Sequence, residues 1–331
     1  MAATIKQIAK LAGVAPTTVS LVLNGNPRIG KKTREHVLKI AAELDYYPNH
    51  PGRLLKQGRT DSIALLSSYF QNIFKMELVS GIEQGIFGGK YQLRQFLSQA
   101  GAESEKAKEI LFGKMADAVI LMSCLPETSF MEKMREAGKP VVLVEETIAG
   151  HPGVEFDNYL AAYRAVEYLA GTGRQRIAIS LGLKAYMGHR FVDDRLKGYI
   201  AAQRDLGLGY SNIIEVPSYT LESGRGIFHD LSGGQAPDAL FCASGDLTAA
   251  GFLQEAMAQG ARIPDDIAVV GFDDSIIARV TTPGLTTVRQ PVQEMGRAAL
   301  DLALAIVEET DLGAWERVVR FEPEIVTRQT A

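Results

Sequence analysis

The 331-residue chain is poor in cysteine and has no long apolar run. Cys124 and Cys242 lie far apart with no metal-type spacing, so we expect two buried thiols in a reducing cytoplasm. The longest apolar runs, such as residues 118–122, are far too short to span a bilayer. The opening residues "MAATIKQIAK" enter an amphipathic pattern and do not resemble a secretory signal. These features predict a soluble cytoplasmic protein with no membrane partner.

Motifs of common enzyme classes are also lacking. The stretch "GTG" at 171–173 follows a predicted helix and precedes a predicted strand, so it is a helix-ending loop and not a dinucleotide fingerprint. There is no phosphate-binding P-loop and no nucleophile elbow, and the five histidines form no ligand-spaced pair. We therefore expect no enzyme activity, no cofactor and no metal site.

What the chain does have is a strong charge asymmetry. Residues 1–60 carry ten Lys/Arg against three Asp/Glu, a net charge of +7. Since the whole chain has a net charge of −4, the remainder carries −11. A basic amino-terminal segment on an acidic body indicates that the segment meets a polyanion and the body does not.

The basic segment has the pattern of three short helices. Thr4 and Gln7 form a capping-box pair, and apolar residues recur behind them at helical spacing until Gly13, which is suited to end a helix. Pro16 suits the first turn of a second helix, and a third runs from about 31 to 44. Two helices joined by a glycine-containing turn and braced by a third are typical of a helix-turn-helix.

The second helix has an unusual outward face. Val19, Val22 and Leu23 form its apolar side, which places Thr17 and the apolar Leu21 on the opposite side. Thr18 and Ser20 flank that outward face. An outward face of small polar groups suits the major groove of DNA, with the hydroxyls on phosphates. A generic three-helix domain is the alternative, and the basic excess counts against it.

The body, residues 61–331, alternates strand and helix patterns. Helical stretches such as 161–170 and 247–259 separate short β-branched runs. These predicted strands cover residues 62–68, 91–97, 117–123, 140–146, 176–180, 238–244 and 266–272. Repeated strand–helix units predict an α/β fold of doubly wound parallel sheets in two lobes, where ligands bind outside the carboxyl ends of strands.

The motifs of the head and the body together resemble one known family. "TIKQIAKLAGVAPTTVSLVLNGN" (4–26) and "TREHVLKIAAELDYYPN" (33–49) are similar to the head of the lactose/galactose repressor (LacI/GalR) family of bacterial transcription regulators. Further along, "RLKGY" (195–199), "IPDDIAVVGFDDS" (263–275) and "PGLTTVRQPVQEMGRAAL" (283–300) follow in that family's order. The resemblance covers nearly the whole chain.

The resemblance implies a division of the chain into three parts. Residues 1–48 would form an all-α helix-turn-helix DNA-binding domain and residues 49–60 a hinge. Residues 61–331 would form a periplasmic-binding-protein-like effector-binding and dimerisation domain. Its first lobe would comprise about 61–158 and 292–320, and its second about 162–288 and 321–331.

The resemblance also implies the DNA contacts. In the family, a hinge helix forms on the operator and inserts a leucine into the minor groove, and by spacing Leu55 is that leucine. Pro51 and Gly52 depart from the family, and glycine costs about 1 kcal/mol relative to alanine in a helix, so this hinge should order less readily without DNA. A flexible linker in the free protein is the alternative. The predicted DNA-binding residues are Thr4, Pro16, Thr17, Thr18, Ser20, Leu21, Asn24, Tyr46, Asn49, Arg53, Leu55 and Lys56.

For the effector, the resemblance implies Phe74 and Lys75 from the first lobe and Arg195, Asp246 and Asp273 from the second. Carboxylates and an arginine beside an aromatic wall suit a sugar. For Arg195 and Asp246, a structural ion pair or helix cap is an equal alternative. Lys75 departs from the family: it either lines the cleft and pairs with a sugar acid or phosphosugar, or it is an ordinary surface lysine, and the sequence favours neither.

The function that follows is a sequence-specific repressor of the LacI/GalR type whose operator affinity is controlled allosterically by a small effector. Two heads in a homodimer would read a palindromic double-stranded operator. The last residues show no added leucine heptad, which favours a simple dimer over a tetramer. Two other classes of protein compete with this interpretation. The absence of a signal peptide and the presence of a basic head disfavour a solute-binding protein of a transport system. The absence of enzyme motifs disfavours a cytosolic enzyme.

Overall fold

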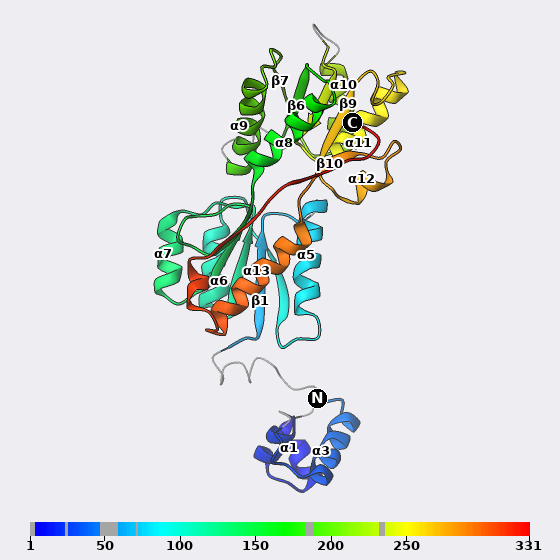
Figure 1. Cartoon of the computed structure of the whole chain (residues 1–331). Helices are drawn as coiled ribbons and strands as arrows, with labels where there is room; N and C mark the ends of the chain where they lie inside the picture. Colours follow the sequence, from blue (N-terminus) through cyan, green and yellow to red (C-terminus); the bar gives the residue numbers. More distant parts are fainter. Residues whose placement is uncertain (1–3, 24–25, 47–58, 71, 183–188, 232–235) are drawn as a thin grey trace. The chain divides into compact units, whose positions relative to one another are not determined.

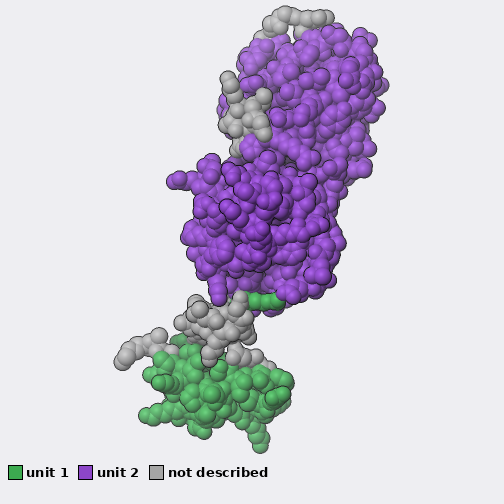
Figure 2. Space-filling model, turned by 90° about the vertical axis from the view of Figure 1, so that its left-hand side faces the viewer, with its two compact units in different colours: residues 1–59 green, residues 60–331 purple. Residues whose placement is uncertain are grey.

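The computed structural model describes residues 4–23, 26–46, 59–70, 72–182, 189–231 and 236–331. The chain divides into two compact units, Met1–Arg59 and Thr60–Ala331, which Figure 2 shows in separate colours. Within the described ranges, no helix is both long and apolar enough to cross a membrane.

The described residues of the first unit form the helices α1 (Ile5–Ala12), α2 (Pro16–Leu23) and α3 (Lys31–Glu43). The capping box is present, since Gln7 N–H donates to the Thr4 hydroxyl and Thr4 N–H donates to the Gln7 side chain. Gly13 ends α1 in the left-handed conformation, with φ 63°. These local predictions are confirmed. Seven buried side chains from the three helices form one small core: Ile8, Ala9, Val19, Val22, Val37, Ile40 and Ala41.

The second unit contains two lobes, each built on a six-stranded sheet (Figure 1). The sheet of lobe 1 has the order β11-β5-β4-β3-β1-β2, and all its strand pairs are parallel. Its strands are β1 (Ser62–Ser67), β2 (Gln92–Leu97), β3 (Ala118–Met122), β4 (Val141–Val144), β5 (Gly153–Phe156) and β11 (Val318–Phe321). Its helical elements are α5 (Ile73–Ile86), α6 (Glu103–Phe112), α7 (Thr128–Glu136), α13 (Val292–Val307) and the short 3-10 helix η2 (Leu312–Trp315).

The sheet of lobe 2 has the order β12-β10-β9-β8-β6-β7, and only β12 runs antiparallel to its neighbour. Its strands are β6 (Ile177–Leu181), β7 (Asn212–Glu215), β8 (Ala239–Cys242), β9 (Ala268–Asp273), β10 (Thr286–Arg289) and β12 (Glu324–Val326). Its helices are α8 (Asn158–Gly171), α9 (Arg190–Asp205), α10 (Leu221–Asp230), α11 (Asp246–Ala258) and α12 (Ile276–Val280).

The chain crosses between the lobes three times (Figure 1). It leaves lobe 1 after β5 and enters α8, returns after β10 into α13, and crosses again between β11 and β12. The predicted α/β architecture of two doubly wound lobes, in addition to a small helical unit, is therefore confirmed. All seven predicted strands are present, and the sequence analysis did not identify β5, β7, β10, β11 or β12, each of which has only three or four residues.

The packing of α5 against α13 depends on two glycines. A Cβ on Gly81 would lie 2.0 Å from the carbonyl oxygen of Gln293, and a Cβ on Gly296 would lie 2.3 Å from that of Leu78. We expect Gly81→Ala to lower the free energy of unfolding by about 2 kcal/mol, because the two backbones must move apart.

Gly171→Ala, at the end of α8, is the matched control. A Cβ there would meet nothing within 4 Å, so this variant should be neutral or stabilise the fold by up to about 1 kcal/mol. Urea unfolding of both variants measures the difference. Equal effects would show that the close approach of α5 and α13 does not limit stability.

Candidate functional site

A cavity of about 390 Å³ lies between the two lobes, outside the carboxyl ends of their strands. Lobe 1 contributes Tyr69, Asn72, Ile73, Phe74, Met76, Ser123 and Glu145 to its wall, and lobe 2 contributes Phe191, Arg195, Tyr219, Ser244, Gly245, Asp246, Leu247, Asp273 and Ser275. The wall thus combines aromatic and aliphatic surface with a few polar groups, as is usual for a small-molecule site. Four of the five residues that the sequence suggested for an effector line it; Lys75 is the exception.

Arg195 projects from α9 and is held by two hydrogen bonds. Its Nε donates to Asn158 Oδ1 at 2.8 Å, and its Nη1 donates to the carbonyl oxygen of Ala243 at 2.7 Å. The guanidinium lies over the Phe272 ring, 3.7 Å from the centroid. Burial lowers the pKa of Arg195, and the nearby Asp273 carboxylate acts in the opposite direction. The arginine therefore has both of the roles considered for it: it makes structural contacts and it forms part of the cavity wall.

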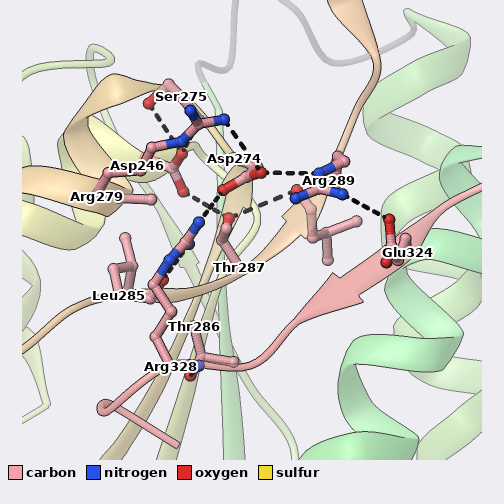
Figure 3. A network of polar contacts seen from close by, with 12 residues as sticks. Asp246, Asp274, Ser275, Arg279, Leu285, Thr286, Thr287, Arg289, Glu324 and Arg328 are labelled. Atoms are coloured by element: carbon pink, nitrogen blue, oxygen red, sulfur yellow. Dashed lines mark hydrogen bonds and ion pairs between the residues drawn. The ribbon is translucent and has the colours of Figure 1, made fainter.

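Asp246 opens α11 and has little freedom to move. Its Oδ2 accepts from the backbone N–H and the hydroxyl of Ser275, at 2.7 and 2.9 Å, and its Oδ1 accepts from Thr287 Oγ1 at 2.6 Å (Figure 3). Burial raises the pKa of Asp246 to about 7, which these hydrogen bonds partly oppose. Because both oxygens are already occupied, Asp246 holds the wall together more than it offers a free acceptor.

Asp273, at the end of β9, differs from Asp246 in its surroundings. Within the described part of the chain, its side chain makes no hydrogen bond or ion pair. Burial raises its pKa well above the ordinary value, the neighbouring Asp246 adds to the rise, and Arg195 opposes it. Asp273 thus offers a ligand carboxyl oxygens that no described residue occupies, beside a buried guanidinium.

Lys75 fits neither of the alternatives that its sequence left open. It is not a surface lysine, since its side chain is buried with 1% of its area exposed, and it is not among the residues that line the cavity. Its Nζ donates to Ser67 Oγ at 2.7 Å and lies 3.5 Å from the centroid of the Tyr69 ring. Burial lowers the pKa of Lys75 to about 8, and the charge of Glu145 acts to raise it. Lys75 therefore supports the cavity wall from behind through Tyr69.

The sequence analysis missed several wall residues, among them Tyr69, Ser123, Glu145, Phe191 and Tyr219. Glu145 is the most consequential, because it brings a second carboxylate from lobe 1, where its oxygen accepts a short hydrogen bond from the Ser123 hydroxyl. Burial raises the pKa of Glu145. A signal was present: Ser123 and Glu145 directly follow the strands β3 and β4, at the ends where ligands bind in such sheets.

The charges around the cavity balance in pairs. Lys75 and Arg195 each act to lower the pKa of Glu145, and Arg195 does the same for Asp273. Burial raises the pKa of Asp246 to about 7, which favours its neutral form, although the hydrogen bonds from hydroxyl and amide groups favour the charged form. Neither charge sign is in clear excess, so the wall suits a neutral polar molecule.

In the first unit, α2 presents the face that the sequence predicted. Thr17 and Leu21 are exposed, Leu21 by 40%, and Thr18 and Ser20 are half-buried. Pro16 and Thr4 are exposed at the starts of α2 and α1, whereas Tyr46 is half-buried against the core of the unit. The remaining predicted DNA-binding residues lie outside the described residues: Asn24, Asn49, Arg53, Leu55 and Lys56.

The two cysteines are free, and burial raises the pKa of each thiol to about 12. Cys242 is buried, but the expectation that Cys124 is also buried was wrong, since it is only half-buried next to the cavity-lining Ser123. Across the described segments, no group of three or more His, Cys, Asp or Glu side chains is placed to hold a metal ion.

Comparisons with known proteins match both parts of the chain. A family described as "Bacterial regulatory proteins, lacI family" matches residues 4–49, and one described as "Periplasmic binding protein-like domain" matches residues 166–331. The NTD biosynthesis operon regulator NtdR of Bacillus subtilis (strain 168) is 31% identical over 339 residues, covering 99% of each chain.

Solved structures agree with these matches. A "transcriptional regulator CelR-cellobiose complex" is 29% identical, with a TM-score of 0.71 over 99% of this chain and 100% of that chain. The Lac repressor dimer bound to operator and the anti-inducer ONPF, 23% identical, has the same fold, with a TM-score of 0.85 over 100% of this chain and 99% of that chain. The chain therefore belongs to the lacI family of bacterial regulatory proteins, and it is a DNA-binding transcriptional regulator with an effector-binding domain.

Proposed function

We propose that this regulator is a repressor that binds a palindromic operator as a homodimer and that a neutral sugar in the cavity between its lobes sets its operator affinity. The observation that carries this proposal is the cavity itself, with a free carboxylate, Asp273, beside a buried guanidinium, Arg195. A hydroxyl pair of a sugar can donate to the first and accept from the second. Aromatic side chains such as Phe74 and Phe191 supply the apolar wall that sugar rings pack against.

Balanced charges support a neutral sugar over a sugar acid or a phosphosugar. The case for an anion rested on Lys75 lining the cleft, and its ammonium instead contacts Ser67 and Tyr69 behind the wall. An anion in the cavity would lie near Glu145 and Asp273 with Arg195 as the nearest lining cation. The cellobiose bound to the related CelR is a neutral sugar, which supports the same class for this chain.

Calorimetry with matched sugars tests the effector class. Glucose, galactose, ribose and cellobiose would be compared with gluconate and glucose 6-phosphate at pH 7.5. We expect at least one neutral sugar to bind, and each anionic counterpart to bind about tenfold more weakly or not at all, because an anion loses its hydration where the lining cation Arg195 already donates to Asn158 and Ala243. Tighter binding of an anionic compound than of its neutral counterpart would refute the proposed class.

For DNA, we propose that α2 enters the major groove with Thr17 and Leu21 toward the bases and Thr18 and Ser20 toward phosphates. In the same arrangement Thr4, Pro16, Asn24, Tyr46 and Asn49 contact the backbone or position the helix, and Arg53, Leu55 and Lys56 act in the hinge. Exposure of Thr17 and Leu21 on the face opposite the core supports this orientation. We propose part boundaries at 48/49 and 60/61, close to the limit of the compact first unit at Arg59.

Leu21 leads to a specific expectation about the operator. Leucine cannot donate to guanine, but it can pack against a thymine methyl group, so the half-site should prefer an A·T pair opposite Leu21 or show little preference. Leu21→Arg should raise affinity for a G·C pair at that place by about tenfold, since a bidentate contact contributes about 1–3 kcal/mol. Binding-site selection with wild type and variant measures both. Strong selection of G·C by the wild type would show that the proposed orientation of α2 is wrong.

We propose that the regulator binds its ligands without catalysing a reaction and that it acts in the bacterial cytoplasm. Its protein partner is a second copy of the chain. One head offers few base contacts, and two-fold symmetry doubles them at a fixed spacing. A gel shift on the DNA upstream of its own gene should show sequence-specific binding that weakens steeply between 50 and 200 mM salt. Equal binding to scrambled DNA would refute the proposed operator.

A further inference from the structure

The turn Asp273–Ser275 faces the cavity and the lobe crossings at the same time. Asp273 and Ser275 line the cavity, whereas the Asp274 side chain, 2% exposed, does not line it and pairs with three arginines (Figure 3). Asp273 and Asp274 both have positive φ, 107° and 55°, a conformation that few non-glycine residues adopt. Such a conformation persists only where surrounding contacts hold it.

The three arginines supply those contacts. Arg289 Nε donates to Asp274 Oδ2 at 2.8 Å, and Arg328 Nη2 donates to Oδ1 at 2.5 Å. Arg279 Nη2 lies 3.7 Å from Oδ2. The Arg328 side chain also donates to the carbonyl oxygen of Leu285, and its backbone N–H donates to Thr286 Oγ1, so the C-terminal segment is tied to the start of β10. The carboxylate of Asp274 thus fixes the turn relative to three separate segments of lobe 2.

Arg289 extends this cluster to the crossings. It is the last residue of β10, immediately before the chain returns to lobe 1, and its Nη1 donates to Glu324 Oε2 at 2.8 Å. Glu324 is the first residue of β12, immediately after the third crossing, and it is paired in register with Arg289. Two of the three crossings are therefore tied by one guanidinium to a turn that lines the cavity.

A second connection runs beside the first. Asp246, in the cavity wall, accepts hydrogen bonds from Ser275 in the turn and from Thr287, which lies two residues before Arg289 on β10. The backbone N–H of Gln290 donates to the carbonyl oxygen of Asp273 at 3.3 Å. A displacement of the turn would consequently move the end of β10, where the chain crosses to lobe 1.

We infer that Arg289 is a positioning residue that sets the angle between the lobes, and that the pair Arg289–Glu324 transmits movement of the Asp273–Ser275 turn to the crossings. The inference rests on the proposed function in one respect: it takes the angle between the lobes as the quantity that the effector changes. Arg289 and Glu324 are partly exposed, their side chains by 42% and 65%, so their ion pair adds little to overall stability. The ion pair matters instead for the geometry of the crossings, because it joins the residue before the second crossing to the residue after the third.

The test measures the distance between the lobes without added ligand, so it is independent of the sugar and of the operator. Spin labels on cysteines at Glu136 in α7 and Ala258 in α11, both exposed positions, report on lobe 1 and lobe 2. Cys124→Ser removes the half-buried native thiol, and Cys242 is buried. Labelled protein is diluted tenfold with unlabelled protein, so that pulsed electron resonance reports distances within one chain.

We expect wild type to give one narrow distance distribution and both Arg289→Gln and Glu324→Gln to broaden or shift it by several ångströms. Arg289→Lys should not give the wild-type distance distribution either, since one ammonium cannot reproduce the two directed contacts to Asp274 and Glu324. Asp301→Asn is the matched control: it breaks an equally exposed pair, Arg297–Asp301 at 2.9 Å, within α13 and away from the crossings, and should leave the distribution unchanged.

Thermal unfolding of each variant separates positioning from a merely structural role, which would lower the midpoint without changing the distance in the folded protein. Midpoints within a few degrees of wild type, together with the altered distances, support the inference. The inference would be overturned if Arg289→Gln and Glu324→Gln gave the wild-type distances. It would also be overturned if Arg289→Lys gave them. Failure of the sugar panel or the gel shift would instead count against the proposed function and leave this result standing.

Discussion

Replacing Arg195 with methionine should weaken binding of the effector sugar by about 100-fold or more. The guanidinium is buried, and its removal leaves Asn158 Oδ1 and the carbonyl oxygen of Ala243 without their donors. It also leaves Asp273 without the positive charge that offsets its burial. Loss of one partner from a buried, charge-assisted contact costs about 2–5 kcal/mol in binding, which corresponds to this fold-change. Calorimetric titration with whichever neutral sugar binds wild type measures the effect.

Arg190→Met is the control on the same helix. Arg190 is half-exposed, contacts Thr147 and Glu155, and is not among the residues that line the cavity. Its replacement should change sugar affinity by less than about threefold, since neither Arg190 nor its partner Glu155 lines the cavity. Thermal unfolding should find both variants folded. Equal losses in the two variants would show that Arg195 acts through the stability of α9 and not through the ligand.

Lys75→Met should change how stability depends on pH above neutrality. Folding lowers the pKa of Lys75 from 10.5 to about 8, so between these values the native state binds fewer protons than the unfolded state. The contribution of Lys75 to the free energy of unfolding therefore increases as pH rises through this window, and below pH 8 the cost of burying the charged form is fully present. The difference between wild type and Lys75→Met should shift in favour of wild type by about 2 kcal/mol from pH 8 to pH 10.

Urea unfolding of wild type, Lys75→Met and Lys197→Met at pH 7, 8, 9 and 10 measures this difference. Lys197 is exposed, with 66% of its side chain accessible, so its variant controls for the loss of one positive charge at the surface. Its stability curve should run parallel to that of wild type. A parallel curve for Lys75→Met as well would mean that the ammonium of Lys75 is as well solvated in the folded protein as in the unfolded chain.

Much of the fold followed from the sequence because the informative patterns are local. Capping by Thr4 and Gln7, the left-handed Gly13 and the apolar face of α2 each depend on residues within one or two helical turns. The longer β-branched runs likewise identified the central strands. Short strands such as β5 (Gly153–Phe156) escaped detection, because four residues pair only through long-range contacts that the sequence does not show.

The site was predicted in part, for a comparable reason. Asp246 and Asp273 lie at the carboxyl ends of strands, where ligands bind in such folds, whereas Arg195 was implied only by the family resemblance. The position of Lys75 depends instead on how α5 packs over β1, where Ser67 and Tyr69 receive its ammonium. Its burial then reverses the argument for an anionic effector, since Lys75 balances Glu145 from behind the wall.

The central claim is that the cavity and the head are coupled, and one titration tests it most directly. Fluorescence anisotropy on a labelled operator fragment from the regulator's own upstream DNA would be recorded with and without a saturating neutral sugar chosen by calorimetry. The account predicts that the sugar changes the dissociation constant by at least about fivefold in wild type, the lower end of typical allosteric coupling, and not in Arg195→Met. An identical dissociation constant with and without every sugar that binds would contradict it.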